Sequence, residues 1–152
     1  WSGAAGVSVV GMARVSTYIN TMGHTEEAFR FYAEVFGTEV TALTRFGDVG
    51  MDHLPEKERS GVMHAEVPIL AGHMLMGTDM LESAGHAVRI GNNTTINLEP
   101  DTRAEADRIY ALLSLDSTES SGGLADMPWG AYWGTCLDRF GIRWMFNVAV
   151  QQ

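Results

Sequence analysis

Two side chains of the segment Met63–Ile69, His64 and Glu66, could carry out acid–base chemistry together. Alternate residues of a β-strand lie on the same face, so this pair would be neighbours if the segment is a strand. A carboxylate beside an imidazole can orient that imidazole as a general base. The sequence shows no nucleophile matched to the pair, and a hydrogen-bonded structural role is the alternative to catalysis.

The same pair could instead bind a metal ion. His73 opens the next apolar segment and could lie close to His64 and Glu66. Two imidazole nitrogens and a carboxylate oxygen would suit a borderline divalent cation. A metal site built on these three residues is therefore a second interpretation of the pair.

Composition excludes several classes of partner. The formal charge of −9 repels the phosphates of nucleic acids and anionic membranes, and it would suit a cationic ligand. No segment approaches the ~18 apolar residues of a membrane span. The single cysteine, Cys136, excludes an intrachain disulfide and favours a cytoplasmic protein, and its apolar surroundings predict a buried, unreactive thiol. There is no glycine-rich cofactor loop, and we expect no cofactor.

The elements that would position these side chains are repeated along the chain. Three short segments of the first half return, in the same order, in the second half. Such echoes predict two copies of one supersecondary unit, and a cleft between related halves is a natural ligand site. The paired segments are Thr17–Asn20 with Thr94–Asn97, Glu27–Tyr32 with Glu105–Tyr110, and Gly72–Met76 with Gly141–Met145.

Each copy is predicted to be a β-α-β-β-β unit. Segments rich in β-branched and aromatic residues predict strands, and apolar residues at helical spacing predict one helix in each copy. Thr25 is expected to cap the first helix, and Thr102, in a capping box with Glu105, the second. The predicted fold class is therefore α+β: two tandem βαβββ modules form a curved mixed sheet around a cleft, with the helices on the outer face.

These patterns also set the expected boundaries. We expect one domain over residues 12–152, with module one at about 13–80, module two at about 92–150, and residues 1–11 as a tag or a disordered extension. In module one the expected strands are 15–20, 38–46, 62–70 and 73–78, with a loop at 47–61. In module two they are 93–99, 131–137 and 143–150, with a loop at 115–127 that has room for one short strand.

Several stretches of the chain resemble a known family. They are Glu26–Gly37, Met63–Ile69, Gly72–Gly77, Trp129–Gly134 and Asp138–Met145. With the duplicated unit, they resemble the vicinal oxygen chelate superfamily, which holds glyoxalase I, extradiol dioxygenases and bleomycin-resistance proteins, and especially its PhnB-like branch. The resemblance runs from about Val15 to Val148. It implies the fold given above and a homodimer, because such modules often pair across chains to complete their clefts.

The resemblance also implies a place for a metal ion. In metal-dependent members each module supplies one ligand from its first strand and one from its last, usually His or Gln, and Glu. The first helix and the internal repeat align Thr17, Met76, Thr94 and Met145 with these four positions. None carries a charge or a good nitrogen donor, and thioethers suit Cu(I) rather than a hard divalent cation. We therefore expect no metal at the usual site.

Strand alternation assigns the residues that would line the cleft. Trp144, Phe146 and Val148 form the apolar face of the last strand and should pack under a helix, so the opposite face should line the cleft. Trp129 and Trp133 could stack on a flat or cationic ligand, with core packing as the alternative. The predicted cleft residues are Thr17, Ile19, His64, Glu66, Met74, Met76, Thr94, Ile96, Trp129, Trp133, Arg143 and Met145.

The predicted function is binding of a small molecule, cationic or aromatic, by a homodimer of this fold that lacks the usual divalent-metal ligands. The alternative is an enzyme of the same superfamily: a lyase, isomerase or dioxygenase that uses a metal or the pair His64 and Glu66. A third possibility is a structural or partner-binding protein with a collapsed cleft. Nothing in the sequence identifies the ligand.

Overall fold

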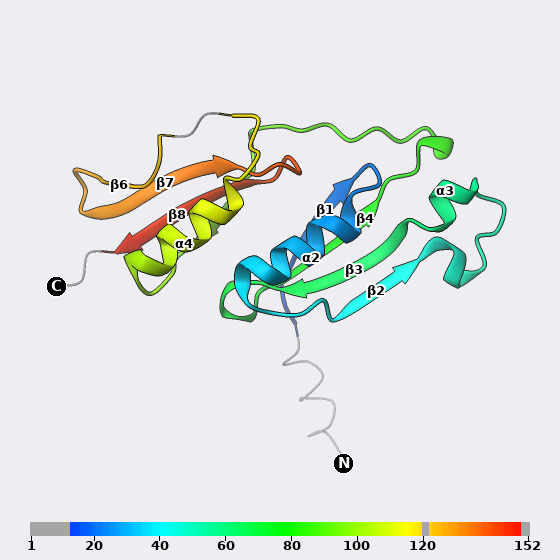
Figure 1. The fold of residues 1–152 in the computed structure, drawn as a ribbon, viewed down its shortest axis with the longest axis horizontal. Helices are drawn as coiled ribbons and strands as arrows, with labels where there is room; N and C mark the ends of the chain where they lie inside the picture. The colour runs from blue at the N-terminus through cyan, green and yellow to red at the C-terminus, as the bar shows by residue number, and fades with distance from the viewer. Residues whose placement is uncertain (1–12, 120–121, 150–152) are drawn as a thin grey trace, which may run out of the picture.

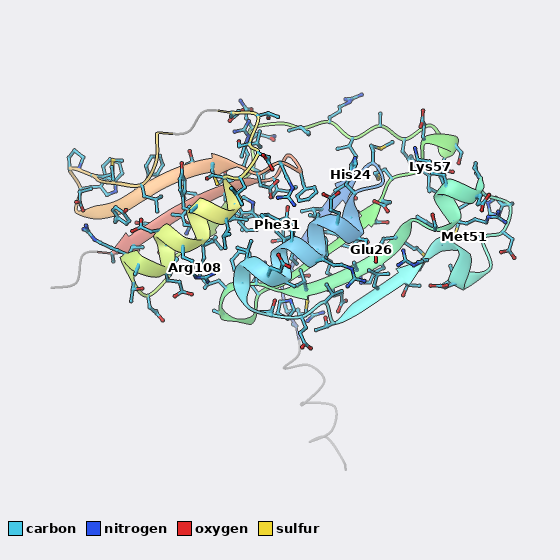
Figure 2. The ribbon with its side chains drawn as sticks, viewed as in Figure 1. His24, Glu26, Phe31, Met51, Lys57 and Arg108 are labelled. Carbon is cyan, nitrogen blue, oxygen red and sulfur yellow. The ribbon has the colours of Figure 1, made fainter. Side chains whose placement is uncertain are left out.

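The computed structural model describes residues 13–119 and 122–149, so the extension expected at residues 1–11 lies outside the described residues. Within them are two four-stranded sheets, each packed on one face by a long helix (Figure 1). This arrangement confirms the predicted α+β fold of two tandem βαβββ modules.

Module one forms the first sheet, in the strand order β1-β4-β3-β2. Strand β1 runs parallel to β4, and the other pairs are antiparallel. The second strand is shorter than expected because the ladder with β3 begins only at Ala42. The elements are β1 (Thr17–Thr21), α2 (Thr25–Phe36), β2 (Ala42–Arg45), β3 (Val62–Pro68) and β4 (Met74–Asp79).

Module two repeats this arrangement in the strand order β5-β8-β7-β6. Strand β7 has the predicted bounds, whereas β5 keeps only three residues of the expected 93–99. The short strand anticipated in the loop is β6. The elements are β5 (Ile96–Leu98), α4 (Arg103–Leu113), β6 (Ala125–Asp126), β7 (Ala131–Leu137) and β8 (Arg143–Ala149).

The segment 47–61, expected to be a loop, contains two short helical turns. They are η1 (Phe46–Val49) and α3 (Glu56–Arg59). The Asp48 carboxylate accepts the Arg45 backbone N–H at 3.0 Å and so fixes the start of η1. Two further short turns, η2 (Leu70–Gly72) and η3 (Glu82–Ala84), lie between strands of module one and after it.

The two long helices begin in different ways. Thr102 caps α4 as expected, because its hydroxyl accepts the Glu105 N–H at 3.1 Å. Thr25 does not cap α2. Instead the Asp79 carboxylate, at the end of β4, accepts the N–H groups of Gly23 and Thr25, each at 3.1 Å. A carboxylate from the neighbouring strand thus satisfies the helix N-terminus, and its charge also favours that end of the helix dipole.

One hydrophobic core serves both modules. Helices α2 and α4 contact each other, and Figure 1 shows them on the same side of the molecule. Tyr32 of α2 donates its hydroxyl to Asp138 at 2.5 Å, and Trp144 of β8 donates its indole N–H to the same carboxylate at 2.8 Å. Asp138 is only 1% exposed. A buried side chain of module two therefore completes the packing of module one.

None of the helices within residues 13–119 and 122–149 has the length and apolar character that crossing a bilayer requires.

Candidate functional site

Each sheet has a helix-covered face and an opposite face, which we call the open face. In β8, Trp144, Phe146 and Val148 are buried, whereas Met145 and Asn147 are partly exposed, as predicted from alternation. Register partners share a face, so the pairing of strands defines each open face. In module one it carries Tyr18, His64, Glu66, Met76 and Thr78, and in module two Asn97, Trp133, Thr135, Met145 and Asn147.

His64 and Glu66 do touch across one face of β3. The imidazole Nε2 lies 3.0 Å from the Glu66 carboxylate, as the sequence suggested. The other ring nitrogen, Nδ1, lies 3.2 Å from the Tyr18 hydroxyl, and the two rings are 5.8 Å apart. Three polar side chains from β1 and β3 therefore form a continuous hydrogen-bonded chain on the open face of module one. Burial raises the pKa of the Tyr18 phenol, and a contact with the Thr78 hydroxyl opposes this rise.

The first strand lies in the opposite register from the one expected. Ile19, assigned to the cleft, is 6% exposed and belongs to the core, and Thr17 shares its face. Tyr18 faces outward instead. The expected position of Thr17 came from the resemblance of the first helix to the family, and a slip of one residue exchanges the two faces of a strand. Because Tyr18 and Ile19 both suit a buried position, the sequence carried no signal that distinguished the registers.

The same inversion occurs in β5. Ile96 pairs with Trp144 and packs against the core, while Asn97 pairs with Met145 on the open face. The positions for a metal in the first and last strands are therefore taken by Tyr18 with Met76 and by Asn97 with Met145. A neutral phenol, an amide and two thioethers do not fit a hard divalent cation.

The structure does not assemble the second proposed metal site either. His73 hydrogen-bonds through Nε2 to the Thr17 hydroxyl at 2.9 Å. Among the residues that the structure describes, no group of three His, Cys, Asp or Glu side chains could hold a metal. The expectation that His73 joins His64 and Glu66 is therefore wrong, because His73 is drawn to the edge of the sheet at β1.

A pocket lies between the modules, which we call the seam pocket. It has a volume of about 450 Å³ and lies between β1, the connector after β4 and the β5 and β8 region. Five predicted cleft residues line it: Thr17, Ile19, Thr94, Ile96 and Arg143. A neighbouring pocket of about 540 Å³ continues along the same seam and shares Thr17, Thr94 and Ile96. The predicted residues of the first strands thus meet between the modules, although their faces were misassigned.

The other predicted cleft residues lie elsewhere. His64, Glu66, Met74, Met76, Trp133 and Met145 belong to the two open faces and are not among the residues lining either pocket. Trp129 is 66% exposed and meets Trp133 edge to face, with ring centroids 6.1 Å apart. Core packing, the alternative for the tryptophans, therefore does not apply to Trp129.

Arg143 closes one wall of the seam. Its guanidinium donates to the Gly91 carbonyl at 2.8 Å and to the Glu119 carboxylate at 2.7 and 3.1 Å. This ion pair raises the pKa of Arg143 and lowers that of Glu119. Arg143 thus fastens the connector to β8, and its positive charge is already paired.

Cys136 behaves as its surroundings predicted. Its thiol is buried, and burial raises the pKa to about 11. A thiol with so high a pKa is a poor nucleophile near neutral pH.

Comparisons with known proteins agree with this architecture. Protein YjdN of Escherichia coli (strain K12) is 27% identical in an alignment of 152 positions, gaps included, that covers 91% of this chain and 97% of YjdN. Protein PA1353 from Pseudomonas aeruginosa superposes with a TM-score of 0.76 at 27% identity, over 91% of this chain and 99% of its own. The PhnB protein from Bacillus cereus superposes at 0.74 and 22% identity, over 90% and 100%.

The family comparison covers most of the chain. The profile of the Glyoxalase/Bleomycin resistance protein/Dioxygenase superfamily matches residues 16–146, which span both modules. The predicted likeness to the PhnB-like branch is met by the similarity in fold to the PhnB protein. With its duplicated βαβββ modules, the chain belongs to the Glyoxalase/Bleomycin resistance protein/Dioxygenase superfamily.

Proposed function

We propose that this protein binds a small organic molecule between its two modules and does so without a divalent metal. The observation that carries the proposal is the seam pocket, where residues of both modules line a volume of about 450 Å³. That volume is in the range of small-molecule sites, which are mostly apolar with a few polar groups. Ile19 and Ile96 supply apolar wall, and Asn20 and Asn93 supply amide groups.

The charge of the protein supports a cationic or aromatic ligand. The formal charge of −9 raises the local concentration of cations near the surface. The positive charge of Arg143 at the seam is compensated by Glu119.

Pocket-filling variants test the location of the site. Thr94 lines the seam pocket from an exposed position, so Thr94→Trp should fill the pocket with little effect on folding. Thr95→Trp is the matched control, because Thr95 is adjacent and exposed and lines only the neighbouring pocket of about 540 Å³. The probes are aromatic cations and a basic glycopeptide, followed by amide chemical shifts of residues 17–20 and 93–96.

We expect a probe to shift signals from both modules together in the wild type and in Thr95→Trp, and to lose at least about tenfold in affinity in Thr94→Trp, which corresponds to ~1.4 kcal/mol. Absence of binding by every probe, or binding that Thr94→Trp leaves unchanged, would contradict the proposal.

We also propose that the protein works as a homodimer in which the open faces of the two chains meet around a shared cleft that a ligand can enter. Met76 and Met145 are partly exposed on these faces, and Trp129 is largely exposed. Large exposed apolar groups gathered on one surface commonly mark an interface. Light scattering should give twice the mass of the chain, 16.6 kDa, and Met76→Lys should return a folded monomer. A wild-type monomer at micromolar concentration would exclude this assembly.

A further inference from the structure

In the hydrogen-bonded chain of Glu66, His64 and Tyr18, the chemistry of the atoms assigns the donor and the acceptor of each bond. An ionised carboxylate only accepts hydrogen bonds, so at 3.0 Å from Glu66 the Nε2 atom of His64 must carry its proton. In a neutral imidazole the other nitrogen is then unprotonated. Nδ1 therefore accepts, and the Tyr18 hydroxyl, 3.2 Å away, donates to it.

We propose that this directed chain makes the Tyr18 oxygen a hydrogen-bond acceptor that selects ligands bearing N–H donors, and that protonation of His64 reverses its polarity. The single phenolic proton is committed to His64, so the oxygen presents lone pairs to the open face. Tyr18 is 49% exposed, which leaves it accessible. The nearby Glu66 carboxylate makes a positively charged donor, such as a primary ammonium group, the preferred ligand.

The reversal follows from the same geometry. A protonated imidazole donates from both nitrogens, so Nδ1–H would donate to the Tyr18 oxygen and free the phenolic proton to donate outward. The β2 partners of His64 and Glu66 are Thr44 and Ala42, and their β4 neighbours are Thr78 and Met76. None of these four side chains titrates. Glu66 and Tyr18 are thus the titratable groups in contact with His64, and protonation of His64 would both repel a cationic ligand and turn the outward-facing Tyr18 hydroxyl into a donor.

Only the selection of a ligand rests on the proposed function. The hydrogen bonds among Glu66, His64 and Tyr18 can be tested in the free protein. Long-range ¹H–¹⁵N spectra of the imidazole report its tautomer. We expect neutral His64 to be protonated at Nε2 in the wild type and in Tyr18→Phe, and to lose that bias in Glu66→Gln. A neutral His64 protonated at Nδ1 would overturn the chain.

The ligand step is tested with two cations of similar shape. Benzylammonium has N–H donors, and benzyltrimethylammonium has the same charge and ring but none. We expect benzylammonium to bind about tenfold more tightly at neutral pH, the size of one hydrogen bond to a charged group. Tyr18→Phe should remove most of that preference, as should acidification until His64 is protonated. Tyr132→Phe is the matched control, since Tyr132 binds Asp107 on the helix side of module two.

The outcomes distinguish the proposed role of Tyr18 from the proposed ligand site in the seam pocket. Equal binding of both cations in the wild type, or a preference that survives in Tyr18→Phe, overturns the role of Tyr18. If neither cation perturbs the Tyr18 and His64 signals while His64 is protonated at Nε2, the chain stands and its ligand class is wrong. Tyr18 also lines the seam pocket. Binding in that pocket is therefore tested separately, by the substitutions at Thr94 and Thr95, which leave Glu66, His64 and Tyr18 unchanged.

Discussion

The two modules share a fold but place their aromatic rings and polar groups differently. In module one the helix supplies the ring: Phe29 of α2 lies over Gly77, where a Cβ atom would come within 2.8 Å of it. In module two the strand supplies it, because Phe146 of β8 is buried and meets Tyr110 of α4 edge to face at 5.5 Å. Gly77 and Phe146 both follow a methionine of the sequence echo, Met76 and Met145. The ring at this level therefore comes from the helix in module one and from the strand in module two.

The open faces differ as well. Module one carries the chain of Tyr18, His64 and Glu66, whereas the strand β7 of module two presents Trp133 and Thr135. The chain ties β1 to β3, and nothing comparable links β5 to β7 among the described contacts. The two modules thus share a scaffold, but the open face of module one carries a hydrogen-bonded chain and that of module two an indole ring. A ligand would therefore meet different chemical groups on the two open faces.

The largest expected effect tests how each module fills its core. Phe146→Ala should lower the free energy of unfolding by about 3–5 kcal/mol, because it leaves a cavity the size of a ring. Gly77→Ala should cost about 1–3 kcal/mol through overpacking against Phe29. Chemical denaturation measures both, with Leu115→Ala, at an exposed position, as the control.

A double mutant tests whether the ring of Phe29 causes the cost of Gly77→Ala. The cost of Gly77→Ala should shrink when Phe29 is replaced by Leu, since the ring that the new Cβ meets is then gone. Additive costs would show that the ring is not what excludes a side chain at Gly77.

A second prediction contrasts the two buried carboxylates. Asp138 serves both modules through Tyr32 and Trp144, whereas Asp79 binds only groups of module one. Asp138→Asn should cost about 2–3 kcal/mol, since a charge-assisted acceptor is lost in the core. Hydrogen exchange should then rise in both modules, whereas Asp79→Asn should raise it mainly in module one.

The control for these substitutions is Asp126→Asn, because the Asp126 side chain is exposed. A change confined to module two in Asp138→Asn would show that the carboxylate does not couple the modules.

The smallest expected effect depends on pH. Hydrogen bonds from Arg45, and then from Arg30, lower the pKa of Glu26 from 4.5 to about 2. A lowered folded-state pKa means that the stabilisation is present above pH 4.5 and is lost as the pH falls towards 2. Because the carboxylate is about one third exposed, solvent screening reduces this contribution to about 1 kcal/mol.

Urea denaturation at pH 7 and pH 2.5 measures this contribution. Glu26→Gln should be less stable than the wild type at pH 7 and should lose most of that difference at pH 2.5, whereas Glu105→Gln in α4 is the matched change in module two. A constant difference between wild type and Glu26→Gln at both pH values would assign the effect to packing rather than charge.

Local patterns predicted much of this molecule. The apolar alternation of β8 and the bounds of β7 were read correctly, as was the capping of α4 by Thr102. What local patterns missed depends on distant partners. Asp79 caps α2 from 54 residues away, and Tyr32 meets Asp138 across 106 residues. The register of β1 is set by its pairing with β4, which no pattern within five residues encodes. Tyr18 was missed for that reason.

The hydrogen bond between Tyr32 and Asp138 limits how the gene could be divided and recombined. If the first half were made alone, Tyr32 would lose both its acceptor and the rings of Phe140 and Trp144 that cover it. Exchange of one half for that of a related protein would succeed only where the incoming half places a carboxylate at the position of Asp138. The two halves thus depend on each other as one folding unit.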